Sequence, residues 1–87
     1  MLTIDEVRFW GCSSVIVETT NREKEYGFFA GSEPDPPVVT GKWLFCTNWN
    51  KPEYLETKDK ALLINIVHKD IKVIRSQDSE LFAIKNP

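Results

Sequence analysis

The sequence predicts a single small domain, spanning residues 1–87, that is built mainly of β-strands. A chain of 87 residues can bury one hydrophobic core but has no room for a second. Hydrophobic residues make up 41% and charged residues 28%, and this ordinary globular composition excludes an intrinsically disordered chain. The apolar stretches are short, rich in valine, isoleucine and aromatic residues, and separated by polar or proline-containing segments. That pattern is typical of short strands joined by turns.

The chain opens with a segment that is predicted to be a short helix over residues 4–10. Thr3 is followed three residues later by Glu6, which is the spacing of a capping box, and Gly11 stands where the helix would end. The alternative for residues 3–10 is a strand, because valine and aromatic residues in this segment favour one. The capping pattern makes the helix the preferred interpretation.

A β-hairpin is predicted next, from strands over residues 13–20 and 25–30 that are joined by the polar residues 21–24. Gly27 interrupts the second strand and marks a bend or a bulge. Alternation along this strand places three side chains on the inward face: Tyr26, Phe28 and Ala30. Phe29 would then face outward and would need cover from the leading helix or from another chain.

The middle of the chain is predicted to hold a loop, a strand and a helical turn. Residues 31–37 contain three prolines and predict an exposed, stiff loop. A strand follows within residues 38–48, and four consecutive apolar residues in it indicate a central strand with both faces covered. Residues 53–60 allow a helical turn with Tyr54 and Leu55 directed inward.

The C-terminal third is predicted to add further strands. Residues 58–68 are ambiguous between helix and strand, and a strand over residues 61–67 is favoured because its isoleucine and valine side chains are β-branched. A strand over residues 71–74, a turn at 76–79 and a strand over 81–85 complete the chain.

The overall architecture follows from the shortness of these strands, which cannot form a stable flat sheet on their own. We therefore expect a five- to six-stranded antiparallel barrel or a strongly bent sheet, SH3-like or OB-like in architecture, with the short N-terminal helix packed on it. An α+β class is the alternative. The chain carries no motif specific to one family of these architectures.

The two cysteines, Cys12 and Cys46, are too few for the disulfide framework of a small secreted domain. Both lie among apolar residues, which favours reduced thiols and a cytoplasmic location. The first six residues include two acids, which argues against a signal peptide. The longest apolar runs have four residues, so no membrane association is expected.

Catalytic, metal and cofactor chemistry is not expected from this sequence. A nucleophilic cysteine requires a base within hydrogen-bond reach, and His68 is the one histidine. We expect packed cysteines and a surface histidine, so an enzyme based on Cys12 and His68 is the least favoured hypothesis. Cys12, Cys46 and His68 share no short spacing, which predicts no metal site, and none of the four glycines belongs to a phosphate-binding motif.

Aromatic side chains are the main functional signal, because three tryptophans, two tyrosines and five phenylalanines exceed what a small core needs. Four of them are expected in the core: Phe9, Phe28, Trp43 and Phe45. Trp49 lies among polar residues in a predicted loop, where the favoured interpretation is that its ring folds back over the core as a lid. An exposed ring would instead anchor a protein pocket or stack on a base or sugar. The candidate binding residues are Trp49, Tyr54, Asn48, Asn50, Lys51, Phe29 and Trp10.

The favoured function is a non-catalytic protein-binding module, such as an adaptor, an inhibitor or immunity-type protein, or a small subunit of an assembly. The alternative is a nucleic-acid-binding small barrel that stacks bases on Trp49 or Tyr54. Its phosphate contacts would come from six basic residues: Lys51, Lys58, Lys60, Lys69, Lys72 and Arg75. The net charge of −2, with seven acids against four bases in residues 1–44, disfavours a polyanion partner. Unpaired sheet edges leave a homo-oligomer open.

Overall fold

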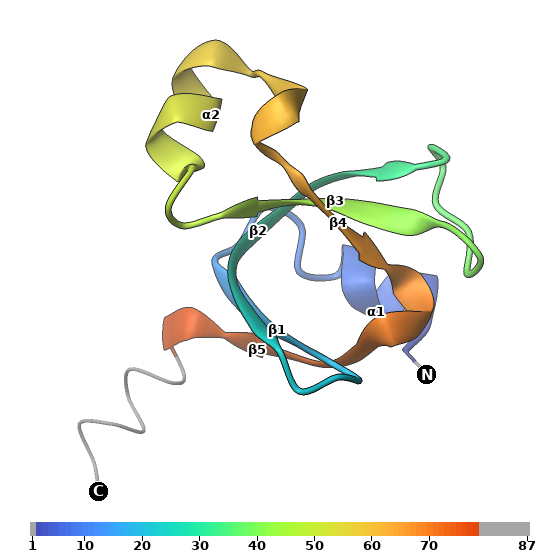
Figure 1. Ribbon diagram of the computed structural model, residues 1–87. Coiled ribbons are helices and arrows are strands. Elements are labelled where there is room, and N and C mark those ends of the chain that lie inside the picture. The colour runs from blue at the N-terminus through green and yellow to red at the C-terminus, as the bar shows by residue number, and fades with distance from the viewer. Residues whose placement is uncertain (1, 79–87) are drawn as a thin grey trace, which may run out of the picture.

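The structure, a computed structural model that describes residues 2–78, is a mainly β domain (Figure 1). Five antiparallel strands form one sheet in the order β4-β3-β2-β1-β5. The elements, in chain order, are α1 (Ile4–Arg8), β1 (Val15–Thr19), β2 (Lys24–Glu33), β3 (Lys42–Thr47), α2 (Lys51–Thr57), the 3-10 turn η1 (Lys60–Leu62), β4 (Ile64–Val67), the 3-10 turn η2 (His68–Asp70) and β5 (Ile71–Ser76). The sheet confirms the mainly β class.

The sheet is open among the residues described, because β4 and β5 are its edges and do not pair with each other. The two edges are nevertheless consecutive in the chain, since only η2 separates Val67 from Ile71. A 3-10 segment of that length advances about 8 Å. The outer strands of a flat five-stranded sheet would lie about 19 Å apart. The sheet therefore has to curl until its edges approach at this corner, which fits the bent-sheet alternative rather than a closed barrel.

α1 forms where the capping box predicts a helix. The N–H of Glu6 donates to Oγ1 of Thr3, and the N–H of Thr3 donates to Oε1 of Glu6, each at 3.1 Å. The helix ends at Arg8, earlier than predicted, and places Val7 in the core at 1% exposure. The structure therefore confirms the helix over the strand alternative, and the capping box satisfies two backbone donors at the start of the helix.

β2 departs from the predicted packing, because both of its faces are covered. Alternation predicts an outward Phe29, but this ring is 6% exposed and lies edge-on to Trp43 and Phe45, at centroid distances of 5.6 and 5.2 Å. Phe28 is equally buried on the opposite face, where it packs against Tyr54 of α2. The buried residues of the main core are Val7, Val15, Val17, Phe29, Trp43, Phe45, Ile66 and Ile71.

The bulge in β2 follows Phe29, because the pairing register with β3 shifts between Phe29 and Gly31. Gly27, where the sequence predicts the bend or bulge, has a different role. A Cβ at Gly27 would lie 1.9 Å from the carbonyl oxygen of Cys46, so glycine is required for the close approach of the two backbones. Tyr26, which is predicted to face inward, is 41% exposed.

The central part of the chain agrees with the prediction in type but differs in its boundaries. β3 is flanked by β2 and β4, which confirms it as a central strand, and β4 confirms the strand favoured for the ambiguous region. β2 extends to Glu33, into the predicted loop, and α2 begins at Lys51, ahead of the predicted residues 53–60. Leu55 of α2 is predicted inward but is 48% exposed.

The C-terminal part of the described chain contains β5, which confirms the strand predicted over residues 71–74. Gln77 and Asp78 are helical where the sequence predicts a turn. The predicted strand over residues 81–85 lies outside the described residues. No helix between residues 2 and 78 has the length and apolar character needed to cross a membrane.

Candidate functional site

His68 is committed to a structural role. The sequence predicts a surface side chain, but His68 is 0% exposed. The indole N–H of Trp43 donates to Nδ1 of His68 at 3.0 Å, and Nε2 lies 2.7 Å from the carbonyl oxygen of Leu2. Because Nδ1 accepts a hydrogen bond, Nε2 carries the proton and donates to Leu2, so both ring nitrogens are used. The imidazole is therefore bonded to an indole and a main-chain carbonyl, and not to a cysteine.

The two cysteines occupy different environments. Cys12 is exposed, whereas Cys46 is buried in β3. Burial raises the pKa of the Cys46 thiol, and the positive charge of Lys51 offsets part of that effect. Cys46 therefore behaves as a small apolar residue of the core. In the part of the chain that is described, no group of three or more histidine, cysteine, aspartate and glutamate side chains could hold a metal ion.

Trp49 projects from the turn that connects β3 to α2. Its side chain is 92% exposed, so the favoured interpretation that it folds back over the core is wrong. The N–H of Asn50 donates to the carbonyl of Thr47 at 3.0 Å, and the N–H of Lys51 donates to the carbonyl of Asn48 at 3.4 Å. These bonds close a tight turn around Trp49.

Two asparagines fix this turn on either side of Trp49. The amide of Asn48 exchanges two hydrogen bonds with the amide of Gln77, at 3.1 and 3.2 Å, and so joins the turn to the end of β5. Nδ2 of Asn50 donates to the carbonyl of Leu62 in η1 at 3.1 Å. The sequence predicts both asparagines as binding residues, but their amides hold the turn and leave Trp49 as its outward group.

A small hollow of about 260 Å³ lies between α2 and β2. Its lining residues are Cys12, Phe28, Ala30, Lys51, Tyr54, Leu55 and Lys58. The ammonium group of Lys51 lies 5.8 Å from the ring centroid of Phe28, and that of Lys58 lies 5.6 Å from the ring centroid of Tyr54. These cation–π contacts already occupy the ring faces with the protein's own cations. The predicted binding residues Lys51 and Tyr54 thus meet in this hollow.

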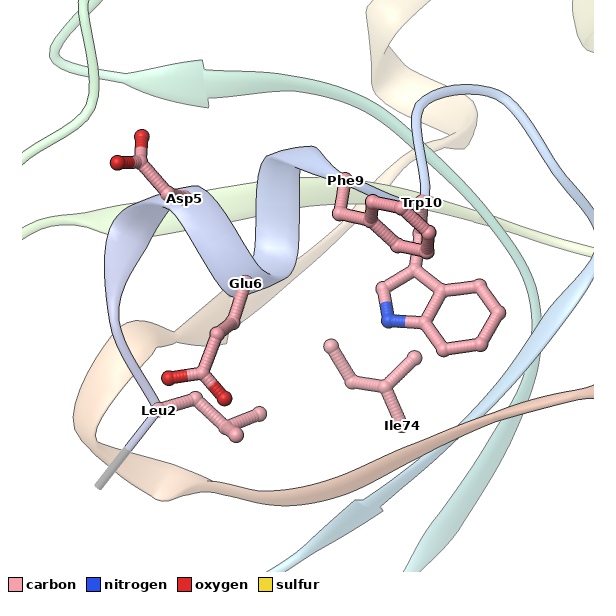
Figure 2. A pocket seen from close by; sticks show the side chains of 6 residues that line it. All are labelled: Leu2, Asp5, Glu6, Phe9, Trp10 and Ile74. Carbon is pink, nitrogen blue, oxygen red and sulfur yellow. The ribbon is translucent and has the colours of Figure 1, made fainter.

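A larger groove lies between α1 and β5 and is called here the α1 groove (Figure 2). Its volume is about 480 Å³, and its described lining residues are Leu2, Asp5, Glu6, Phe9, Trp10 and Ile74. Phe9 is 82% exposed, although the sequence predicts it in the core. The rings of Phe9 and Trp10 meet edge to face, with centroids 5.7 Å apart and an interplanar angle of 81°.

The outward position of Phe9 follows from the period of α1. The helix buries Val7, and at about 100° per residue position 9 lies roughly 200° further round the helix. Phe9 therefore points away from the core despite its apolar side chain. Of the predicted binding residues, Trp10 lines the α1 groove, whereas Phe29 lies in the core.

Of the six basic residues of the nucleic-acid hypothesis, Lys51 is half-buried, and the other five are exposed but lie on different elements. Lys58 follows α2, Lys60 belongs to η1, Lys69 to η2, and Lys72 and Arg75 to β5. The guanidinium of Arg75 is paired with the carboxylate of Glu18 at 3.3 Å. Asp59 and Asp70 stand directly beside three of the lysines in the chain, so negative charge is interleaved with positive charge here.

No model of a known protein family, no curated protein and no solved structure matches this chain. Function is therefore inferred from the geometry of the chain's own residues. Two surfaces stand out by exposure and shape: the Trp49 turn and the α1 groove.

Proposed function

We propose that the protein is a non-catalytic protein-binding module and that Trp49 anchors its partner. The observation that carries this proposal is an indole ring, 92% exposed, on a turn that side-chain hydrogen bonds hold at both flanks. Tryptophan is among the residues most enriched where single side chains dominate the binding energy of protein interfaces. Its large, stiff ring supplies contact area with few torsions to order.

The fixed turn favours binding because association costs free energy for every interface loop or side chain that is mobile in the free protein and ordered in the complex. Immobilising one flexible interface side chain costs about 0.5–1.5 kcal/mol, and mobile loops add to that cost. Asn48 and Asn50 order the backbone before any partner arrives, so only the torsions of Trp49 remain to be fixed. An anchor ring that fills a partner pocket contributes roughly 2 kcal/mol or more. The gain therefore exceeds the cost of ordering the ring.

We further propose that this bent sheet is an incompletely closed small barrel of SH3-like or OB-like architecture. Consecutive strands from β1 to β4 are neighbours, and β5 returns to lie beside β1. A short η2 then brings the two edge strands together at one corner, as in a sheet that is nearly rolled up. The free edges of β4 and β5 can accept an extended segment of a partner or of a second copy of the chain. Sedimentation analysis of the purified protein tests whether a second copy of the chain binds there, because it measures the oligomeric state.

We propose that the protein is located in the cytoplasm. Cys12 is an exposed free thiol, and such a thiol is kept reduced in the cytosol, whereas oxidising compartments favour its pairing. The protein partner would then be found in the same compartment.

Nucleic acid is the alternative partner, because an exposed indole can also stack on a base. Arg75 is paired with Glu18, and acids lie beside the lysines, so the phosphate-binding contribution is small. Binding to single strands through phosphates would weaken steeply as salt is raised. A titration of single-stranded DNA and RNA at low salt with no response would exclude this alternative.

Affinity capture from native lysate, with and without nuclease, tests the proposed function. Wild type should recover a partner that survives nuclease treatment, and Trp49→Ala should lose it while its melting temperature stays unchanged. Val38→Ala is the matched control, because Val38 is also an exposed apolar side chain (43%) but lies in a different loop. Equal recovery by wild type and Trp49→Ala would show that Trp49 is not the anchor.

A further inference from the structure

We propose that the α1 groove binds the positively charged side chain of a basic peptide, with arginine preferred over lysine. This site is separate from Trp49 and goes beyond the proposed function. The partner segment that fits it carries an arginine next to an aliphatic residue. The groove offers such a segment two aromatic rings, two carboxylates and an apolar floor (Figure 2).

The two rings of the groove form a corner that suits a cation. Phe9 and Trp10 stand nearly perpendicular, at 81°, so a group placed in the corner meets one ring face and one ring edge. A cation within about 6 Å of an aromatic centroid is attracted by the negative face of the ring. Unlike the rings of Phe28 and Tyr54, which have lysines over them, the ring of Phe9 is open to solvent at 82% exposure.

The charged residues among the described lining are both acidic. Glu6 lies beside Leu2 at the end of the groove opposite the rings, whereas the carboxylate of Asp5 points away from Ile74 (Figure 2). Oε1 of Glu6 accepts the N–H of Thr3, and this capping-box bond fixes the carboxylate at the rim. Glu6 therefore supplies a positioned negative charge, and Asp5 adds to the local field.

Leu2 and Ile74 give the groove an apolar floor, with Leu2 beside the Glu6 carboxylate and Ile74 between that carboxylate and the rings. A bound segment can place an aliphatic side chain on this floor while its cation reaches the rings or Glu6. Arginine suits both neighbours because its planar guanidinium stacks on aromatic faces and pairs with carboxylates through a fork of donors. The compact, strongly hydrated ammonium of lysine stacks less well on aromatic rings and pairs with carboxylates without the forked geometry. The indole nitrogen of Trp10 is turned toward this space and can donate to a peptide carbonyl (Figure 2).

Other ligand classes fit the groove less well. An anionic ligand, a phosphate backbone included, would meet two carboxylates and no basic side chain among the described lining residues. A wholly apolar segment would cover Glu6 and remove the water that solvates its carboxylate, without supplying a polar or charged partner in place of that water. A basic segment covers the floor and also neutralises the rim. The charge of the lining thus selects a cation.

The experiment is a titration of the full chain, followed by ¹⁵N NMR, with four blocked tetrapeptides added into the millimolar range. They share a glycine-leucine-X-glycine sequence in which X is arginine, lysine, glutamine or glutamate. The arginine peptide should shift the backbone signals of residues 5–10 and the indole signal of Trp10, with the lysine peptide weaker. Glutamine and glutamate peptides should leave those signals in place. Equal shifts from the glutamine peptide, or no shift from any peptide, would overturn the proposal.

Three variants locate the binding in the groove. Glu6→Gln should weaken binding of the arginine peptide roughly two- to fivefold, the weight of one exposed charge pair, and it retains the capping box because glutamine also serves at that position. Phe9→Ala should weaken it at least as much with little effect on folding, since Phe9 is 82% exposed. Asp5→Asn should have the smaller effect, because its carboxylate points away from the floor. An affinity unchanged by Glu6→Gln and Phe9→Ala would place binding elsewhere.

Trp49→Ala separates this proposal from the protein-binding function. The variant should bind the arginine peptide as tightly as wild type, because Trp49 is not among the residues that line the α1 groove. Loss of the lysate partner with retention of peptide binding supports two separate sites. Retention of the lysate partner with loss of peptide binding would contradict both the Trp49 anchor and the placement of the peptide in the α1 groove.

Discussion

Trp43 and His68 are joined by a buried hydrogen bond from the indole N–H to Nδ1, with the two atoms 3.0 Å apart. The opposite ring nitrogen of His68 lies 2.7 Å from the carbonyl oxygen of Leu2. One imidazole therefore connects β3, η2 and the segment that precedes α1. Because Leu2 also lines the α1 groove, these two hydrogen bonds hold part of the groove's floor in place.

Replacing His68 by alanine should lower the free energy of unfolding by about 2–4 kcal/mol. The substitution leaves the Trp43 indole N–H and the Leu2 carbonyl without their buried partner and opens a cavity beside them. Urea unfolding followed by circular dichroism measures the change. Lys69→Ala is the control, since this exposed neighbour should alter the free energy by no more than about 0.5 kcal/mol. A His68→Ala protein as stable as the control would show that the bond pair contributes little.

Gly27 and Gly31 lie in the same strand and should respond differently to alanine. A Cβ at Gly27 would lie 1.9 Å from the carbonyl oxygen of Cys46, and the paired backbone cannot move away without breaking the register of β2 and β3. A Cβ at Gly31 would lie 3.7 Å from Cδ1 of Leu44, an ordinary contact. Gly27→Ala should therefore cost about 3 kcal/mol or more, and Gly31→Ala less than about 1 kcal/mol. Similar melting temperatures for the two variants would contradict the close approach at Gly27.

Those parts of the fold that depend on local patterns could be predicted from the sequence. The capping box of Thr3 and Glu6 identified α1, and short β-branched stretches identified the strands. The packing of β2 could not be predicted in the same way. Alternation assumes that one face of a strand is covered, but α2 covers the second face, so Phe28 and Phe29 are both buried. Which element covers a face is decided by tertiary structure.

The candidate sites were likewise predictable where they depend on local sequence patterns and unpredictable where they depend on tertiary contacts. Polar neighbours correctly placed Trp49 in a connection, but its exposure depends on hydrogen bonds to Gln77 and Leu62, which no local pattern shows. The burial of His68 likewise depends on partners in two other segments of the chain. The outward position of Phe9 was available from the sequence, because the helical period that buries Val7 turns position 9 to solvent.

Cys12 and Cys46 should differ in their reaction with a thiol reagent. Cys12 is exposed, whereas burial both shields Cys46 and raises its pKa, which lowers the thiolate fraction available for reaction. Native protein should therefore react with one thiol per chain and denatured protein with both. Cys12→Ser should remove the reaction of the native protein. Rapid reaction of the native Cys12→Ser variant would show that Cys46 is accessible.

The raised pKa of Cys46 also predicts a dependence of stability on pH. The thiol is neutral in both states at neutral pH, so its contribution is fully present there. As the pH rises into the alkaline range, the thiol ionises first in the unfolded state, because its pKa is higher in the folded state. The free energy of unfolding should therefore fall as the pH rises. Cys46→Ala should show a shallower decline over the same range, and an identical decline would assign the pH dependence to other groups.

The paired amides of Asn48 and Gln77 should be energetically coupled. Each single alanine variant leaves the other amide without its partner, and the double variant removes both. A double-mutant cycle by urea unfolding should give a coupling free energy of about 0.5–1 kcal/mol. The single variants report on more than this pair, because Gln77 Nε2 also lies 3.1 Å from the carbonyl oxygen of Val15. The cycle isolates the mutual bonds, since the contact with Val15 is lost equally in both branches that remove Gln77.

The same amides should control the mobility of Trp49. If the turn is ordered by Asn48 and Asn50, then Asn48→Ala and Asn50→Ala should lower the order parameter of the Trp49 backbone amide in ¹⁵N relaxation, while the amide of Phe45 in the core stays rigid. Both variants should then weaken the partner complex less than Trp49→Ala does, because they retain the anchor ring and lose only its ordered backbone. A turn that stays rigid in both variants would mean that its main-chain hydrogen bonds suffice. In that case the preorganisation of Trp49 would come from the main-chain bonds from Asn50 to Thr47 and from Lys51 to Asn48.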